Sequence, residues 1–157
     1  MIVVADTTPL NYLVLIGHIG ILPKLFDQIL VPRAVVLELR HPDAPIEVRD
    51  WIAKPPKWLN VRRIVRVEPA LEYLGAGEQQ AITLALRAGV DAILIDERVA
   101  RREAKQRNLS IIGTLAILDE ADRHNLLNFN DAIHRLHHTS FRISPSLLRG
   151  FVQRRRQ

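Results

Sequence analysis

Four acidic residues occupy positions that fit one kind of chemistry. Asp6 and Asp96 each follow directly on a short apolar run, whereas Glu38 and Glu78 lie in segments with helical periodicity. Two carboxylates about 4 Å apart repel by roughly 4 kcal/mol at an effective dielectric constant of about 20, so a cluster of acids requires protonation or a cation. Oxygen ligands favour Mg²⁺ or Mn²⁺ over zinc, and such a cation lowers the pKa of a water and stabilises charge on the leaving oxygen of a phosphodiester.

Each of these acids also has a simpler interpretation. Asp6 could cap the helix that follows it, and Glu78 could complement a helix N-terminus. Glu38 could point into solvent, and Asp96 with Glu97 could form a turn. The joint placement of the four acids, and not any one of them alone, favours a metal site that hydrolyses phosphodiesters.

The elements that would position these acids alternate between strand and helix. Short apolar runs typical of strands that are covered on both faces occur at residues 2–5, 29–31, 92–95 and 111–112. A weaker strand is predicted over residues 59–65, at an edge of the sheet. Helix start signals lie between these runs, at Thr8-Pro9, Pro32-Arg33, Gly77-Glu78 and Ser144-Pro145.

This alternation predicts an α/β fold with a mostly parallel sheet, because parallel neighbours need crossover connections. Ligands bind at the carboxyl ends of the strands in such sheets. Asp6 and Asp96 both follow strands, so their side chains should converge if the two strands are neighbours. No repeat or linker divides the chain, and residues 1–157 are predicted to form a single domain with a disordered basic end over about 152–157.

Composition narrows the class of protein. The absence of cysteine excludes thiol catalysis, cysteine zinc sites and disulfides, and fits a cytoplasmic protein. The first residues are expected to form a buried strand and not a signal peptide, and no apolar run is long enough to predict a membrane span. Lys and Arg number 22 against 17 Asp and Glu, a balance that suits a polyanionic partner such as RNA.

Several segments together resemble the PIN domain, and more narrowly its VapC-like subgroup of unknown function. The likeness extends over nearly the whole chain. It is carried by Val4-Ala5-Asp6-Thr7-Thr8-Pro9-Leu10, by Val31-Pro32 leading to Glu38, by Gly75-Ala76-Gly77-Glu78 running to Ala85, by Ile95-Asp96 followed by Arg98-Val99-Ala100-Arg101, by Ile112-Gly113-Thr114-Leu115 and by Phe141-Arg142-Ile143-Ser144-Pro145.

The resemblance implies a three-layer α/β/α sandwich, a Mg²⁺ or Mn²⁺ site, and an endoribonuclease that cleaves single-stranded or structured RNA. In toxin members of the family an antitoxin protein blocks the site, and relatives commonly form homodimers. By position, Asp6 matches the acid after the first strand, Glu38 the acid of the second helix, Glu78 the third acid and Asp96 the acid after the fourth strand.

Three details of this match concern neighbouring residues. Thr7 or Thr8 fits the hydroxyl that accompanies the first acid. The third acid is Glu78 where the family more often has Asp, and its longer side chain would reach a metal through water. Glu97 adjoins Asp96, so that either residue of the pair is a candidate ligand.

The helix after Asp96 is strongly basic, and two interpretations of it stay open. Arg98, Arg101, Arg102 and Lys105 could meet an RNA backbone as it approaches the acids. Alternatively, the helix presents a solvated face on which Glu97 pairs with Arg101, and Glu103 with Arg107.

Two other groups of residues favour packing over function. His134, His137 and His138 near Asp131 have a spacing that suits a transition metal, but histidines at a helix surface are the more common explanation. Trp51 and Trp58 are expected to pack in the core, with a self-association or antitoxin surface as the alternative.

Two competing functions remain. One is a catalytically silent PIN-like module that binds RNA or protein. The other is a phospho-accepting receiver domain, which requires a lysine after its last strand where this chain has Gly113-Thr114.

Overall fold

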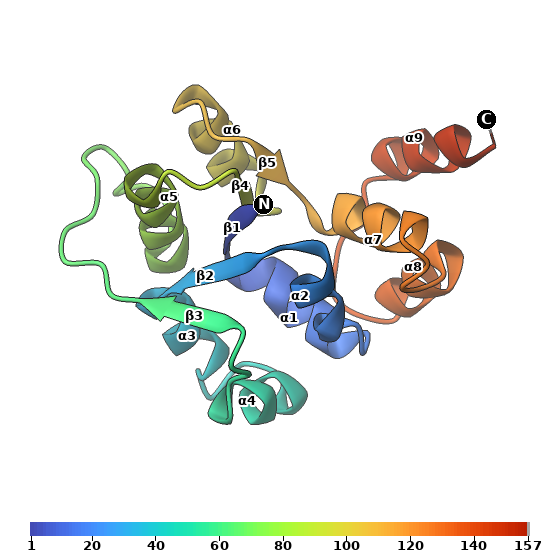
Figure 1. Ribbon diagram of the computed structural model, residues 1–157, viewed down its shortest axis with the longest axis horizontal. Coiled ribbons are helices and arrows are strands. Elements are labelled where there is room, and N and C mark those ends of the chain that lie inside the picture. The colour runs from blue at the N-terminus through green and yellow to red at the C-terminus, as the bar shows by residue number, and fades with distance from the viewer. Residues whose placement is uncertain (157) are drawn as a thin grey trace.

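The computed structural model describes residues 1–156, and its centre is a five-stranded sheet in which all the strands are parallel (Figure 1). The strand order is β3-β2-β1-β4-β5. The strands are β1 (Ile2–Ala5), β2 (Gln28–Pro32), β3 (Leu59–Arg62), β4 (Ala92–Leu94) and β5 (Ile111–Ile112). The predicted parallel α/β fold is thereby confirmed, with the weak third strand at an edge.

Helices connect successive strands and continue beyond the last one. The helices are α1 (Thr7–Leu15), the short 3-10 turn η1 (Ile19–Ile21), α2 (Leu22–Leu25), α3 (Arg33–Leu39), α4 (Ile46–Ala53), α5 (Ala76–Ala88), α6 (Arg98–Gln106), α7 (Thr114–Arg123), α8 (Phe129–His137) and α9 (Pro145–Arg155). None of the helices within residues 1–156 is both long enough and apolar enough to cross a membrane.

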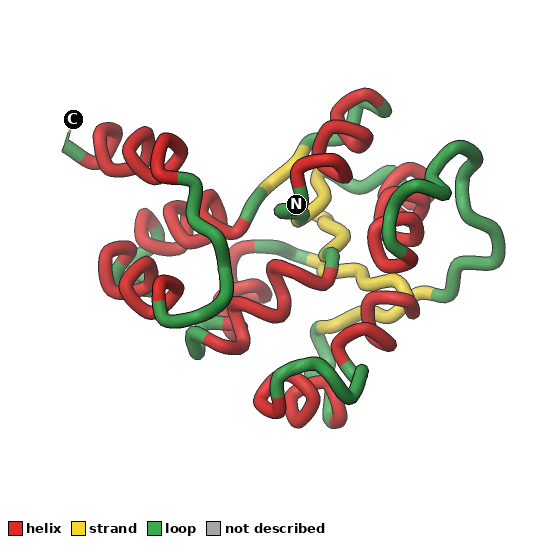
Figure 2. The backbone as a smooth tube through the Cα atoms, turned by 180° about the vertical axis from the view of Figure 1, so that it is seen from behind, coloured by secondary structure: helices red, strands yellow, loops and turns green. Residues whose placement is uncertain are grey.

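The central strands β1, β2 and β4 bury both of their faces, which produces three layers (Figure 2). Along β1, Val3 and Ala5 join a core that includes side chains of α1, α4, α7 and α8. Val4 points to the other face and packs with α5 and α6, where Ile82 and Ala85 are buried. Burial of an apolar side chain of this size contributes about 1.5–3 kcal/mol, so the continuous apolar runs explain why the strands lie in the middle layer.

Some element boundaries differ from the sequence-based prediction. The edge strand ends at Arg62 and not at residue 65, because its partner β2 ends at Pro32, which is paired with Arg62 and leads into α3. Helix α1 begins at Thr7, directly after Asp6. Helix α5 begins at Ala76, which places Glu78 in its first turn.

The basic end of the chain was expected to be disordered over about 152–157, but α9 continues through Arg155. The guanidinium of Arg155 donates to Asp119 on α7 over 2.6 Å and also pairs with Asp122. Arg156 forms the C-cap of the helix, and Gln157 lies outside the described residues. The acidic partners on α7, which the basic composition of the end does not reveal, explain the difference.

Candidate active site

The centre of the candidate site is the point where the strand order reverses direction. The chain proceeds from β1 outward to β3, then returns to place β4 on the other side of β1. Asp6 follows β1 and Asp96 lies just beyond β4, so both lie at the carboxyl edge of neighbouring strands. The backbone N–H of Asp6 donates to the carbonyl of Leu94 over 2.9 Å, which extends the pairing up to the site. Ligands in open parallel sheets bind at such a reversal point.

Asp6 is a buried carboxylate, with only 3% of the residue exposed. It stands at the N-cap of α1, but its side chain makes no capping hydrogen bond, so helix capping does not explain it. Within residues 1–156 it also makes no ion pair with a basic side chain. Burial is the main reason that the pKa of Asp6 is raised to about 7. A hydrogen bond from the Thr7 backbone N–H opposes this shift, and the negative charges of Glu78, Glu38 and Asp96 add to it.

Glu38 lies on α3 and turns its carboxylate toward α5 and α1. Its Oε1 accepts a hydrogen bond from the backbone N–H of Gly77 over 2.9 Å, and its Oε2 accepts one from the hydroxyl of Thr7. A Cβ atom at position 77 would lie 2.6 Å from the Glu38 carboxylate, so the glycine leaves the space that this acid occupies. The residue as a whole is exposed, but its carboxylate is held by two donors and does not extend freely into solvent.

Glu78 is half-buried in the first turn of α5 and accepts a hydrogen bond from the backbone N–H of Gly75 over 3.1 Å. The simpler interpretation is therefore correct in part, because this carboxylate does stabilise a helix N-terminus. Burial raises the pKa of Glu78, and the nearby Glu97 and Glu38 carboxylates raise it further. Glu78 thus stabilises the helix and also adds to the negative charge around Asp6.

Asp96 is held by a residue that sequence reasoning did not select. Thr114, the first residue of α7, donates to the Asp96 carboxylate from its backbone N–H over 2.8 Å and from its hydroxyl over 2.6 Å. Burial raises the pKa of Asp96, whereas the Thr114 hydrogen bonds and the charge of Arg101 act in the opposite direction. The available signal was the segment Ile112-Gly113-Thr114, which follows β5 as Asp96 follows the adjacent β4.

The structure separates the roles of the remaining candidates near these acids. The Glu97 side chain is exposed and accepts from the backbone N–H of Ala100 over 2.8 Å, so it caps α6. Thr7 contacts Glu38, as described above, whereas Thr8 lines a groove beside Asp96. Of the two adjacent acids, Asp96 is the one anchored at the strand ends.

The donor set around Asp6 fits a hard divalent cation in its chemistry, because it consists of carboxylate oxygens around a buried charge that has no counterion among the described residues. Glu38, Glu78 and Asp96 each accept hydrogen bonds from the protein. Within residues 1–156, no three acidic or histidine side chains form a group arranged to hold an ion. The charges of Glu38, Glu78 and Asp96 thus act on Asp6, but over residues 1–156 the four predicted acids do not form a finished ligand shell.

A family model described as a PIN domain (DUF3368) matches residues 2–157. The chain belongs to the PIN-domain family. A PilT N-terminus domain protein from the hyperthermophilic archaeon Sulfolobus solfataricus P2 has a similar structure, with a TM-score of 0.56 and 14% sequence identity over 77% of this chain and 93% of that chain. At this identity the likeness concerns the fold alone. No match to curated protein sequences was found.

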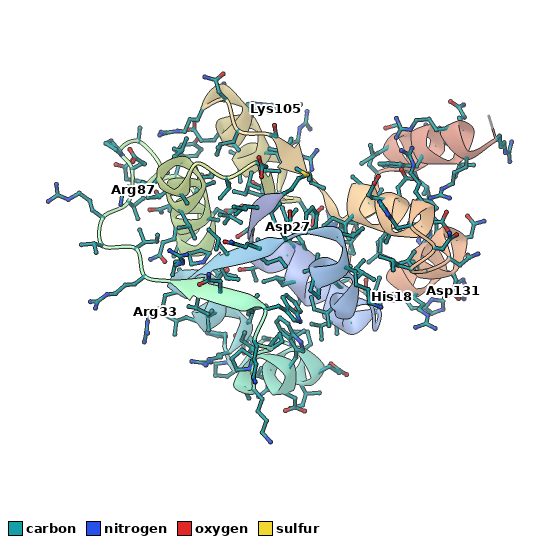
Figure 3. All side chains as sticks on the ribbon, in the orientation of Figure 1. His18, Asp27, Arg33, Arg87, Lys105 and Asp131 are labelled. Atoms are coloured by element: carbon teal, nitrogen blue, oxygen red, sulfur yellow. The ribbon has the colours of Figure 1, made fainter. Side chains whose placement is uncertain are left out.

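PIN domains are typically nucleases that use divalent metals, and nucleic acid is the partner expected for this class. The basic helix α6 of this PIN domain lies next to the acids. Arg98, Arg101, Arg102 and Lys105 line a shallow depression together with Asp96, and Figure 3 labels Lys105 on α6. Arg101 also donates to the carbonyl of Ile95 over 3.0 Å.

The alternative interpretation of α6 holds for one of its two expected ion pairs. Glu103 pairs with Arg107 over 3.2 Å. Over residues 1–156 no ion pair joins Glu97 to Arg101, because Glu97 caps the helix and Arg101 turns toward the strand end. Arg98 and Arg101, the arginines of α6 nearest the acids, thus form no ion pair over residues 1–156, although the charge of Arg101 acts on Asp96.

The histidine cluster lies away from this site on α8, where Figure 3 labels Asp131. Asp131 pairs with Arg135 over 3.2 Å, and the rings of His134 and His138 pack edge to face with centroids 4.7 Å apart. Among the described residues, these side chains do not form a group of three arranged to hold an ion.

The two tryptophans are partly buried and pack against the core. Trp51 and Trp58 pack against each other with ring centroids 6.1 Å apart, and both contact the larger core.

Proposed function

We propose that this PIN domain is a metal-dependent endoribonuclease that uses Mg²⁺ or Mn²⁺ to hydrolyse phosphodiesters of single-stranded or structured RNA. The observation that carries the proposal is the buried Asp6 carboxylate, which has no basic partner within residues 1–156 and on which the charges of Glu38, Glu78 and Asp96 act. Bringing these charges together is costly unless a proton or a cation compensates them. The four acids are the residues that would hold the ion.

The residues around the site would have distinct roles in the proposed reaction. A bound divalent cation supplies an activated water and stabilises charge on the leaving oxygen. Thr114 fixes the orientation of Asp96, and Thr7 with the Gly77 backbone fixes that of Glu38. Arg98 and Arg101, beside Asp96, would neutralise the RNA phosphates and hold the strand at the acids.

Regulation is part of the proposal. The VapC-like resemblance supports a cytoplasmic toxin whose single PIN domain is inhibited by a cognate antitoxin, with a homodimer as the assembly. Expression of the chain alone should then arrest growth, and Asp96→Asn should relieve the arrest. If Asp96→Asn still arrests growth, the toxicity does not depend on the acidic site.

The alternative is a catalytically silent PIN module that binds RNA or protein. One observation favours it: Glu38, Glu78 and Asp96 each accept hydrogen bonds from within the chain, and the four acids do not form a finished ligand shell among the described residues.

The test is cleavage of single-stranded RNA by purified protein in Mn²⁺, with and without chelator, beside Asp6→Asn and Asp50→Asn. Asp50 is exposed and belongs to α4, so its substitution controls for the loss of one negative charge. We expect cleavage that requires Mn²⁺, is lost in Asp6→Asn and is retained in Asp50→Asn. If the wild type, Asp6→Asn and Asp50→Asn cleave RNA to the same extent with and without chelator, the nuclease proposal is wrong and the catalytically silent module is the better interpretation.

A further inference from the structure

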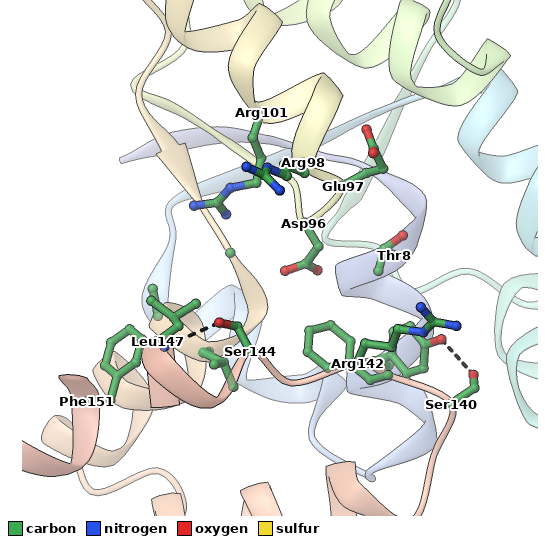
Figure 4. Close-up of a pocket in the computed structure, with 15 residues that line it drawn as sticks. Thr8, Asp96, Glu97, Arg98, Arg101, Ser140, Arg142, Ser144, Leu147 and Phe151 are labelled. Carbon is green, nitrogen blue, oxygen red and sulfur yellow. Dashed lines mark hydrogen bonds between the residues drawn. The ribbon is translucent and has the colours of Figure 1, made fainter. Parts of the chain in front are cut away.

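A groove of about 910 Å³ opens beside Asp96, and none of the other three acids lines it (Figure 4). One side of it is formed by α1 and the first turns of α6 and α7, and the other by the segment 140–151, which leads into and includes α9. Parts of the chain more than 100 residues apart thus meet at the fourth acid. Volumes of 300–1,000 Å³ are typical of small-molecule sites.

The inner surface of the groove is aromatic and apolar. Tyr12 and Phe141 pack edge to face, with ring centroids 5.0 Å apart and ring planes at 79°. The Tyr12 hydroxyl and the Ser140 hydroxyl share a hydrogen bond of 2.8 Å. Leu115 contributes a buried aliphatic side chain to the same surface. Rings held in this way offer a fixed apolar surface to a flat ligand.

The groove also carries an excess of positive charge: three arginines line it beside Asp96 and Glu97, and the charge of Arg101 acts on Asp96. Arg98, Arg101 and Arg142 line it, and in the part of the chain described here none of the three forms an ion pair. Figure 4 shows Asp96 between the arginines of α6 on one side and Arg142 on the other. An anionic ligand could therefore reach the acids while its phosphates contact guanidinium groups.

The far wall of the groove is anchored. Phe151 packs against Phe129 of α8 with ring centroids 6.1 Å apart, and Arg155 pairs with Asp119 of α7. The guanidinium of Arg155 also lies 4.1 Å from the centroid of the Phe129 ring. These contacts hold α9 in place, so the groove is preformed.

We propose that this groove binds the base of the nucleotide next to the scissile phosphate, and that the base contacts the Phe141 ring. The inference rests on the proposed ribonuclease function and adds a base-binding subsite to it. An RNA strand is the occupant that the features favour, because it combines flat apolar bases with negative charge, whereas the groove combines aromatic rings with unpaired arginines. The groove would thus contribute to the choice of cleavage site.

The experiment measures binding without cleavage. Fluorescence anisotropy in chelator gives the Kd of a labelled hexamer of adenylate and of the same ribose-phosphate hexamer without bases, for the wild type and Phe141→Ala. Loss of one base–aromatic contact typically weakens binding about tenfold. We expect Phe141→Ala to weaken adenylate binding by about this factor and to leave binding of the abasic hexamer unchanged.

Two arginine variants separate charge from stacking. Arg142→Ala should lower the slope of log Kd against log salt concentration by about 0.7, the value for one phosphate contact on a single strand. Arg149→Ala is the matched control, because Arg149 is exposed on α9 and does not line the groove. Its salt slope should equal that of the wild type.

The outcomes distinguish this subsite from the nuclease function. Equal losses of affinity for the adenylate and abasic hexamers in Phe141→Ala would overturn the base subsite, even in a protein that cleaves RNA. A loss confined to the adenylate hexamer supports the subsite even where Mn²⁺-dependent cleavage is absent. If the wild type binds both hexamers equally, the base makes no contact and the inference is wrong.

Discussion

Asp6→Asn should stabilise the metal-free protein at alkaline pH, although it removes the central acid of the candidate site. The pKa of this carboxyl is about 7 in the folded protein and 3.8 in the unfolded chain, because burial and three neighbouring acids disfavour its charge. A group whose pKa is raised by folding contributes stability below the unfolded value, and that contribution is lost as the pH rises through the folded value. The free energy of unfolding should therefore fall between about pH 4 and pH 7.

The magnitude follows from the two pKa values. A difference of about three pH units corresponds to about 4 kcal/mol at 1.36 kcal/mol per unit. A buried asparagine amide retains a desolvation cost of about 1–3 kcal/mol where it lacks hydrogen-bond partners. The net gain of Asp6→Asn at pH 8 should thus be about 2 kcal/mol. For a domain of this size each kcal/mol raises Tm by about 2–4 °C.

Urea unfolding at pH 5.5 and pH 8 in chelator measures this effect, with Asp50→Asn as the exposed control. The stability of Asp6→Asn relative to the wild type should increase by about 2 kcal/mol between the two pH values, the product of 1.5 pH units and 1.36 kcal/mol. Asp50→Asn should follow the wild type at both. Addition of Mn²⁺ at pH 8 should stabilise the wild type more than Asp6→Asn, because the ion binds the folded protein.

A pH-independent difference between Asp6→Asn and the wild type would refute the reasoning, since it would mean that Asp6 titrates alike in the folded and unfolded chain. A variant that is less stable than the wild type at pH 8 would also contradict it. Either result would mean that Asp6 is not a buried, uncompensated charge in the folded protein, and the argument for a metal site rests on that charge.

Three further variants test the surroundings of the acids. Thr114→Val should weaken Mn²⁺ binding about 10–100-fold in titrations that follow cleavage, as expected for loss of a hydrogen bond to a ligand, whereas Thr83→Val, at another buried threonine, should not. Gly77→Ala should reduce cleavage without lowering Tm, because the added methyl group displaces the Glu38 carboxylate while alanine stabilises the helix by about 1 kcal/mol. Gly150→Ala is the control: a methyl group at position 150 meets open space, so this variant should change only stability. Arg155→Ala should cost about 2 kcal/mol in urea unfolding through its lost bonds to α7, and a loss below about 0.5 kcal/mol would contradict the anchored wall.

The parts of the fold that could be predicted are those encoded in contiguous residues. Apolar runs at residues 2–5 and 92–95 indicate buried strands, and the acids that follow them must lie at one edge of a parallel sheet. The pairing of β1 with β4 confirms this expectation, since Asp6 and Asp96 follow neighbouring strands. The position of the basic side chains on α6 follows from the same placement, because that helix begins at Arg98, shortly after Asp96.

The features that were missed depend on relations between distant segments. Thr114 follows the apolar run 111–112 much as Asp96 follows its own strand, but the sequence does not show that the two residues are partners. That relation exists because β5 lies next to β4, which the order of strands decides. The end of the chain was predicted to be disordered because its arginines are visible in sequence, whereas the pairing of Arg155 with Asp119 is not.

The same reasoning separates the acids from the groove. A single carboxylate at a strand end could also be a helix cap or part of a turn, but the joint placement of the acids at one edge of a parallel sheet is informative. An aromatic residue such as Phe141 is equally compatible with core packing, and its edge-to-face contact with Tyr12 supports both interpretations. What distinguishes the groove is that these rings meet the unpaired arginines beside Asp96, a combination that arises only when residues 12, 96 and 141 are brought together by the fold.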